Sequence, residues 1–167
     1  IWENHFEQQP PYGFSSIIFL AGAKYNMSLY DPEHIVKNLK KEVEQYPQKL
    51  RQSVIQQALW SAEFTIRQAE SFASKADTYN TFGCLTRAVK SIVTTLFSIN
   101  ELYPMGDKRA MAILEQAETK PTNLTQKIED IFCLEKDGLT RRVSLLKDIF
   151  DEVVKLAAGM YKPYYKL

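Results

Sequence analysis

The stretch TRAVKSIVTTLFSINELY, residues 86–103, decides the fold that we predict for this chain. Its apolar residues recur every three or four positions, which is the period of an amphipathic α-helix. From the preceding residue onward, the apolar positions are Leu85, Ala88, Val89, Ile92, Val93, Leu96, Phe97 and Ile99. Because these side chains cover a wide surface, we expect this segment to be the central helix of a bundle.

A second, polar stripe runs along the same segment. It consists of Arg87, Ser91, Thr94, Ser98 and Glu101, which recur at helical spacing. Long charged side chains are typical of a face exposed to water, whereas small hydroxyl groups permit the close approach of another group. Three interpretations stay open: a solvent-exposed face, close packing on a second helix, or a groove that binds a ligand.

The predicted helix ends in hydrogen-bonding and charged side chains. Asn100 and Glu101 lie at its C-terminus, where the helix dipole is negative, and Lys108 and Arg109 follow the break at Pro104 to Gly106. Such charges can clamp the helix end to the next loop. They can also bind a nucleoside triphosphate or another phosphorylated substrate.

Helical patterns fill the chain after residue 30. Asp31 and Pro32 are suited to the first positions of a helix, and Pro47 separates that helix from the next. The predicted helices span residues 31–46, 48–73, 77–103, 107–118, 124–133 and 139–158. The inner face of the first consists of Ile35, Val36, Leu39 and Val43, which recur at helical spacing. Short connections between long helices imply antiparallel neighbours. We therefore predict an all-α, antiparallel helical bundle of about five to six helices over residues 31–167.

Residues 1–30 differ from the bundle and form a short irregular or extended segment in this prediction. The turn-rich QQPPYG (8–13) precedes an apolar run, Ile17–Ala23, which we interpret as a short buried helix followed by an extended piece. No segment approaches the roughly 20 apolar residues of a membrane span. Because the first residue is Ile1 and not Met, we expect residues 1–30 to link the bundle to a missing domain.

The composition is that of a soluble globular protein of 167 residues. The net charge is +1, so no overall field attracts nucleic acid or an anionic membrane. Cys84 and Cys133 lie in apolar helical patterns and have no partner at metal-ligand spacing. This pattern predicts two reduced, buried thiols and a cytoplasmic protein.

The sequence contains no catalytic set of a recognised kind. It lacks phosphate-binding glycine loops, paired zinc-binding histidines and a nucleophile elbow. Its histidines, His5 and His34, lack the carboxylate spacing of a di-iron bundle, so no metal site is predicted. Acid–base chemistry would depend on carboxylates such as Glu101 or Glu63, although Glu63 with Arg67 is typical of a solvated helix ion pair.

Residues 46–110 resemble the C-terminal helical region of bacterial nucleotidyltransferase-domain proteins of the DUF4037 type. The likeness lies in the order of short signatures: YP before a helix-opening Leu50, then LWSAEF (59–64), GCLTRAVKSIV (83–93) and LFSINELY (96–103), with a Lys shortly after. The loop YPMGDK (103–108) departs from the family pattern, because Asp107 stands for a Glu and an aromatic residue is lost. HEPN domains share this bundle type, but the Arg–His motif of the RNases among them is missing here.

The resemblance implies that two domains bind different substrates. A separate N-terminal α/β domain would hold magnesium and the nucleoside triphosphate, and the helical half would bind a small-molecule or nucleotide acceptor. The residues implied to face the cleft between the halves are Arg87, Asn100, Glu101 and Lys108. Glu101 is then the candidate that orients or deprotonates the acceptor, and Lys108 would neutralise phosphate charge.

In this reading the stripe hydroxyls of Ser91, Thr94 and Ser98 line the substrate groove. The chain would be the non-catalytic half of a nucleotidyltransferase, inactive alone and without a cofactor of its own. Nucleic acid and membrane are not expected partners, and a homodimer is left open. The alternative is a non-catalytic helical module for protein interaction or dimerisation.

Overall fold

The computed structural model describes residues 17–106, 108–133, 138–165 and 167. Across these ranges the chain is all-helical, with seven helices and no strand, which confirms the predicted fold class. The helices are α2 (Ile17–Tyr25), α3 (Ile35–Glu44), α4 (Gln48–Ala73), α5 (Thr78–Ile99), α6 (Ala110–Glu115), α7 (Leu124–Phe132) and α8 (Leu139–Leu156). The QQPPYG turn lies outside the described residues.

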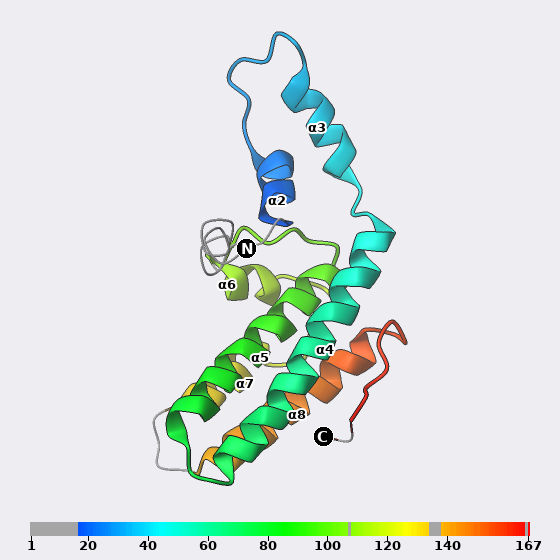
Figure 1. The fold of residues 1–167 in the computed structure, drawn as a ribbon. Helices are drawn as coiled ribbons and strands as arrows, with labels where there is room; N and C mark the ends of the chain where they lie inside the picture. Colours follow the sequence, from blue (N-terminus) through cyan, green and yellow to red (C-terminus); the bar gives the residue numbers. More distant parts are fainter. Residues whose placement is uncertain (1–16, 107, 134–137, 166) are drawn as a thin grey trace, which may run out of the picture.

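The long helices α4 and α5 form an antiparallel pair that α8, α7 and α6 complete as a bundle (Figure 1). Leu59 and Ile66 of α4 are fully buried, as are Leu96 of α5 and Leu146 of α8. Burying a side chain of this size contributes about 1.5–3 kcal/mol. The shared apolar core therefore holds these five helices together.

Helix α5 is the central helix that its sequence predicts. Leu85, Ile92 and Leu96 are buried, whereas Val89 and Val93 are partly exposed. The expectation that no segment approaches a membrane span needs correction, because Thr78–Ile99 is long and apolar enough to cross one by length and composition. Half of its most apolar window is buried inside the protein, as in the core helix of a bundle.

Helices α2 and α3 form a hairpin, residues 17–44, that projects beyond the end of the bundle (Figure 1). They pack on each other around a small core of Ala21, Val43, Tyr46 and Tyr103, which is separate from the main core. Helix α3 therefore shares a core with α2. The sequence pattern assigns these two helices to different parts of the chain, residues 1–30 and residues 31–167.

Helix α3 begins at Ile35, later than predicted. Asp31 still serves the helix start, because its carboxylate accepts hydrogen bonds from the backbone N–H groups of Lys37 (3.0 Å) and Val36 (3.3 Å). These bonds, chiefly that from Lys37, lower the pKa of Asp31. Ile35 and Leu39, predicted to be buried, are 56 % and 50 % exposed, since the described part of the chain does not cover that side of α3.

Helix α5 ends at Ile99, earlier than the predicted Tyr103, because the backbone turns left-handed at Glu101 (φ 55°). The next helix, α6, is correspondingly shorter than predicted. Both cysteines are free. Cys84 is buried as expected, but Cys133 is exposed because it follows the last residue of α7.

The chain after α8 folds back along the bundle as a strap, residues 159–165 (Figure 1). The Tyr161 hydroxyl and the Tyr165 backbone N–H both donate to the carboxylate of Glu63 on α4. Glu63 is thus fully buried and is not the solvated partner of Arg67 that the sequence predicts. Arg67 instead lies over the Tyr165 ring, 4.4 Å from its centroid. Burial, followed by the contact with Glu63, raises the pKa of Tyr161.

Candidate functional site

Part of the polar stripe of α5 lies against α4 in a closed helix contact. The Ser91 hydroxyl lies 3.4 Å from the Ser61 hydroxyl, and the Ser98 hydroxyl donates to the backbone carbonyl of Arg51 at 3.2 Å. Ser98 is buried and also accepts a hydrogen bond from the Tyr46 hydroxyl at 3.4 Å. Small side chains at these positions let the two helices approach closely.

Arg87 and Thr94, two further residues of the polar stripe, form hydrogen bonds within α5 itself. Arg87 is exposed, and its guanidinium donates to the sulfur of Cys84 at 3.1 Å. The Thr94 hydroxyl donates to the Lys90 carbonyl of its own helix at 2.9 Å. Burial raises the pKa of the Cys84 thiol, and Arg87 opposes part of that rise. The substrate role predicted for Arg87 and the hydroxyl groups remains a prediction.

Asn100 fastens the end of α5 to the loop that follows α6. Its amide nitrogen donates to the carbonyls of Leu96 (2.8 Å) and Thr119 (2.7 Å), and its amide oxygen accepts from the Thr119 N–H at 2.9 Å. A surface depression of about 490 Å³ lies beside this connection. Because both ends of the amide are used, Asn100 positions the wall of the depression.

Glu101 occupies the left-handed position that ends α5. The N–H of Leu102 donates to the Phe97 carbonyl at 2.9 Å, and the N–H of Glu101 donates to the Ser98 carbonyl at 3.2 Å. This pair of bonds defines a Schellman motif, in which the left-handed residue is usually Gly. A side chain with a Cβ costs about 1 kcal/mol there, so Glu101 is held in a disfavoured conformation.

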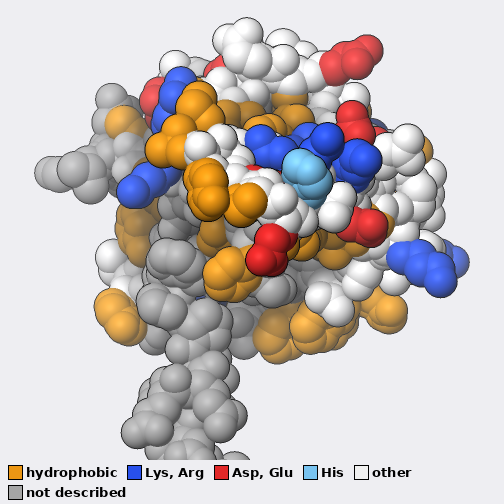
Figure 2. Space-filling view, turned by 90° about the horizontal axis from the view of Figure 1, so that it is seen from above, with side chains coloured by type: hydrophobic (Ala, Val, Ile, Leu, Met, Phe, Trp, Pro, Cys, Tyr) orange, Lys and Arg blue, Asp and Glu red, His pale blue; other side chains and the backbone are white. Residues whose placement is uncertain are grey.

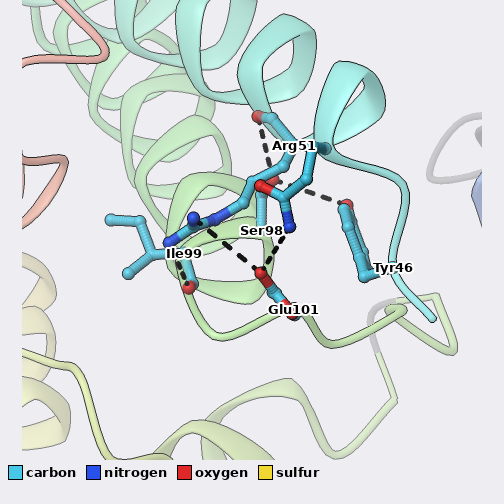
Figure 3. Close-up of polar contacts among 6 residues, drawn as sticks. Tyr46, Arg51, Ser98, Ile99 and Glu101 are labelled. Atoms are coloured by element: carbon cyan, nitrogen blue, oxygen red, sulfur yellow. Dashed lines mark hydrogen bonds and ion pairs between the residues drawn. The ribbon is translucent and has the colours of Figure 1, made fainter.

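The groups around Glu101 come from the start of α4 (Figure 3). Gln48 donates its amide N–H to Glu101 Oε1 at 3.0 Å, and Arg51 Nη1 lies 3.8 Å from the same oxygen. Arg51 also donates to the Ile99 carbonyl at 3.1 Å, at the negative end of α5. The cation beside Glu101 is therefore Arg51, which the sequence analysis missed, while Lys108 is exposed.

A pair of stacked tyrosines lies where the hairpin joins the bundle. The rings of Tyr46 and Tyr103 are 4.7 Å apart, and Lys24 Nζ lies 5.3 Å from the Tyr103 centroid. Burial raises the pKa of both tyrosines. Within the described chain the Tyr103 hydroxyl and Arg51 Nε are buried without a hydrogen-bond partner. Buried polar atoms in proteins normally have a hydrogen-bond partner. This junction therefore has hydrogen-bonding capacity that the described residues do not use.

An open groove of about 950 Å³ lies between α2, the connection after it and α3. Its basic and acidic lining residues are Lys24, Lys37, Lys40, Lys41, His34, Asp31 and Glu44. Figure 2 shows basic side chains gathered around the histidine on this face. Lys24 and Lys40 donate to backbone carbonyls of the hairpin, whereas Lys37 and Lys41 are exposed. The groove is locally basic in a chain whose net charge is only +1.

The same hairpin exposes large apolar side chains. Phe19 is 76 % exposed, and Met27, Leu29 and Tyr30 are each at least 85 % exposed. Figure 2 shows apolar side chains directly beside the basic ones. Exposed apolar side chains that gather on one face mark a surface for interaction, so this face is suited to contact another molecule.

The described residues contain no cluster of three or more side chains placed to hold a metal ion. Glu101 lies beside a cation and an amide, and this arrangement does not supply the several oxygen ligands that a magnesium centre requires. Magnesium binding is therefore not assigned to the described residues.

The fold and the site place the chain in the class of all-α helical bundles. A helical hairpin projects from this bundle and exposes a basic groove next to apolar side chains. The chain belongs to the family described as "Domain of unknown function (DUF4037)", whose model matches residues 18–108. The match spans the hairpin and the α4–α5 pair and includes Glu101. No curated protein and no solved structure matches the chain.

Proposed function

We propose that this chain is the helical, substrate-binding half of a nucleotidyltransferase and that the α2–α3 hairpin docks on the catalytic domain. The observation that carries the proposal is the exposure of Met27, Leu29 and Tyr30 beside the basic groove. An apolar surface with basic side chains next to it suits contact with a folded domain that also holds an anionic substrate.

The groove supplies the chemistry for a phosphorylated substrate. Lys37 and Lys41 are exposed and free to turn toward a phosphate, while Lys24 and Lys40 brace the hairpin through its backbone carbonyls. Lysine ammonium groups form short, charge-assisted hydrogen bonds with phosphate oxygens. In this proposal the partner domain positions the triphosphate, and the lysines offset part of its charge.

Glu101 is the acceptor-orienting residue in this proposal. Its carboxylate is 45 % exposed and can accept a hydrogen bond from an acceptor hydroxyl while Gln48 and Arg51 fix its position.

The test uses the complete gene product with Mg²⁺, nucleoside triphosphates and a small-molecule extract as the source of acceptor. Pyrophosphate release reports transfer. Glu101→Gly removes the carboxylate and relaxes the left-handed position, so we expect the helix end to persist and the rate to fall about 100-fold or more, as for loss of a general base. An undiminished rate would remove Glu101 from the mechanism.

Ala76→Gly is the matched control. Ala76 ends α4 in the same Schellman geometry, with φ 56°, and with the Asp77 N–H donating to the Phe72 carbonyl at 3.0 Å. This variant should relax the backbone equally and leave the rate unchanged. Absence of pyrophosphate release from the unsubstituted complete product would reject the transferase proposal.

The second candidate is a non-catalytic interaction or dimerisation module. The closed contacts of Ser91 and Ser98 with α4 favour it, since they use these hydroxyl groups inside the protein. Sedimentation of the chain with Tyr30→Ser separates the two functions. A dimer that this change disrupts, while Tyr79→Ser at another exposed aromatic has no effect, supports the module.

A further inference from the structure

Another cavity, of about 750 Å³, lies between α4 and the strap, outside the hairpin and the Glu101 region. Its lining residues are Gln56, Gln57, Trp60 and Ser61 from α4, and Gly159, Met160, Tyr161, Lys162 and Tyr164 from the strap. Small-molecule sites in proteins have volumes of roughly 300–1,000 Å³. The cavity is thus large enough for a ligand of ordinary metabolite size.

Aromatic rings supply its apolar surface. Trp60 is 49 % exposed and stacks on Phe64, with ring centroids 5.7 Å apart and an interplanar angle of 7°. Tyr164 is 74 % exposed and lies 6.4 Å from the Tyr161 ring. Exposed, mutually supported rings of this kind offer flat faces on which a heteroaromatic ring can stack.

The polar lining is matched to the edge of such a ring. Gln56 precedes Trp60 by one helical turn, so their side chains lie on the same face of α4. Gln56 and Gln57 are exposed amides that each offer donors and an acceptor. Glutamine amides can pair with the edge of a nucleobase, and the exposed Lys162 adds a cation for an anionic substituent.

The strap side of the cavity is fixed before any ligand binds. Glu63 is fully buried and accepts from the Tyr161 hydroxyl and the Tyr165 N–H. The Tyr161 ring also packs edge-on against Phe150, with centroids 6.5 Å apart. A preorganised wall lowers the ordering cost of binding.

We propose that this cavity binds a mononucleotide, with the base stacked on Trp60, its edge paired with Gln56 or Gln57, and its phosphate held by Lys162. The inference concerns the isolated chain and does not depend on the proposed transferase function.

Trp60 itself reports the test. In a Trp2→Phe background Trp60 is the single tryptophan of the chain, and its fluorescence is titrated with adenosine 5′-monophosphate, adenosine and inorganic phosphate. We expect saturable quenching by the nucleotide, weaker binding of adenosine, and no quenching by phosphate alone. The double substitution Gln56→Ala and Gln57→Ala should weaken the binding of both adenine compounds.

Lys162→Ala should weaken nucleotide binding about tenfold, the scale of one charge-assisted hydrogen bond, and leave adenosine binding unchanged. Lys155→Ala is the matched control, because Lys155 is an exposed lysine of α8 outside the cavity. Tyr164→Ala should weaken the binding of both ligands. Because Tyr164 is highly exposed, this substitution should leave the fold intact.

Three results would overturn the proposal. They are no saturable quenching by nucleotide or adenosine, equal affinity in the Lys162 and Lys155 variants, or quenching by an aromatic peptide but not by adenosine. The last would assign the cavity to a protein segment.

Discussion

The buried carboxylate of Glu63 gives the most quantitative prediction for the fold. Glu63→Ala removes the acceptor shared by the Tyr161 hydroxyl and the Tyr165 N–H. A hydrogen bond to a charged group contributes about 1.5–3 kcal/mol, and a buried donor left without a partner costs about 1–3 kcal/mol. The Tyr165 N–H belongs to an exposed residue and can turn to water, whereas Tyr161 is buried.

We therefore expect Glu63→Ala to lower the free energy of unfolding by about 3 kcal/mol, which corresponds to a fall in Tm of roughly 6–12 °C for a domain of this size. Urea unfolding followed by circular dichroism measures the first quantity. Hydrogen exchange at Tyr165 should show that its amide loses protection.

Glu70→Ala is the matched control on the same helix, two turns further along. Glu70 pairs with Lys147, and their side chains are 43 % and 22 % exposed. Partly exposed ion pairs contribute at most about 1 kcal/mol, so this change should be small. If Glu63→Ala costs no more than Glu70→Ala, the carboxylate is not the buried anchor of the strap.

Other predictions concern single groups. Asn100→Asp should destabilise the chain more than Asn100→Ala, measured by urea unfolding, because a carboxylate oxygen would face the carbonyls of Leu96 and Thr119. Ala76→Gly should raise the free energy of unfolding by about 0.5–1 kcal/mol, since Gly accepts the left-handed backbone; a loss of stability would contradict this. Because burial raises the pKa of Tyr161 above its ordinary value of 10.0, the unfolded chain loses this proton first as pH rises. Stability should therefore decline above about pH 10, and Tyr161→Phe should make that decline shallower.

Helical periodicity was sufficient to predict the bundle. Helix α4 has the predicted bounds, Gln48–Ala73, because Pro47 marks its start and small or apolar residues recur along its buried face. The inner face of α3 was predicted only in part, because Val43 is buried as its position on that face predicts but other residues of the face are not. Its pattern is amphipathic, yet Ile35 and Leu39 remain exposed in the described structure, because periodicity identifies an apolar face and not what covers it.

The surroundings of Glu63 and Glu101 depend on contacts between residues far apart in the sequence, which local spacing cannot predict. Glu63 has Arg67 one turn away, so local spacing predicted an ion pair, but its partner Tyr161 is 98 residues distant. Arg51 likewise contacts Glu101 from another helix, so local spacing did not predict this ion pair. The small hydroxyls of Ser91 and Ser98 were recognised as a close-approach stripe, and only the structure shows that α4 lies against them.

Docking through the hairpin is tested most directly by hydrogen exchange over residues 26–34, compared between this chain and the complete gene product. Met27, Leu29 and Tyr30 are at least 85 % exposed here, so their backbone amides should exchange quickly in the chain alone. The proposal predicts that these amides become at least about tenfold more protected in the complete product. Equal exchange in the two proteins would contradict it.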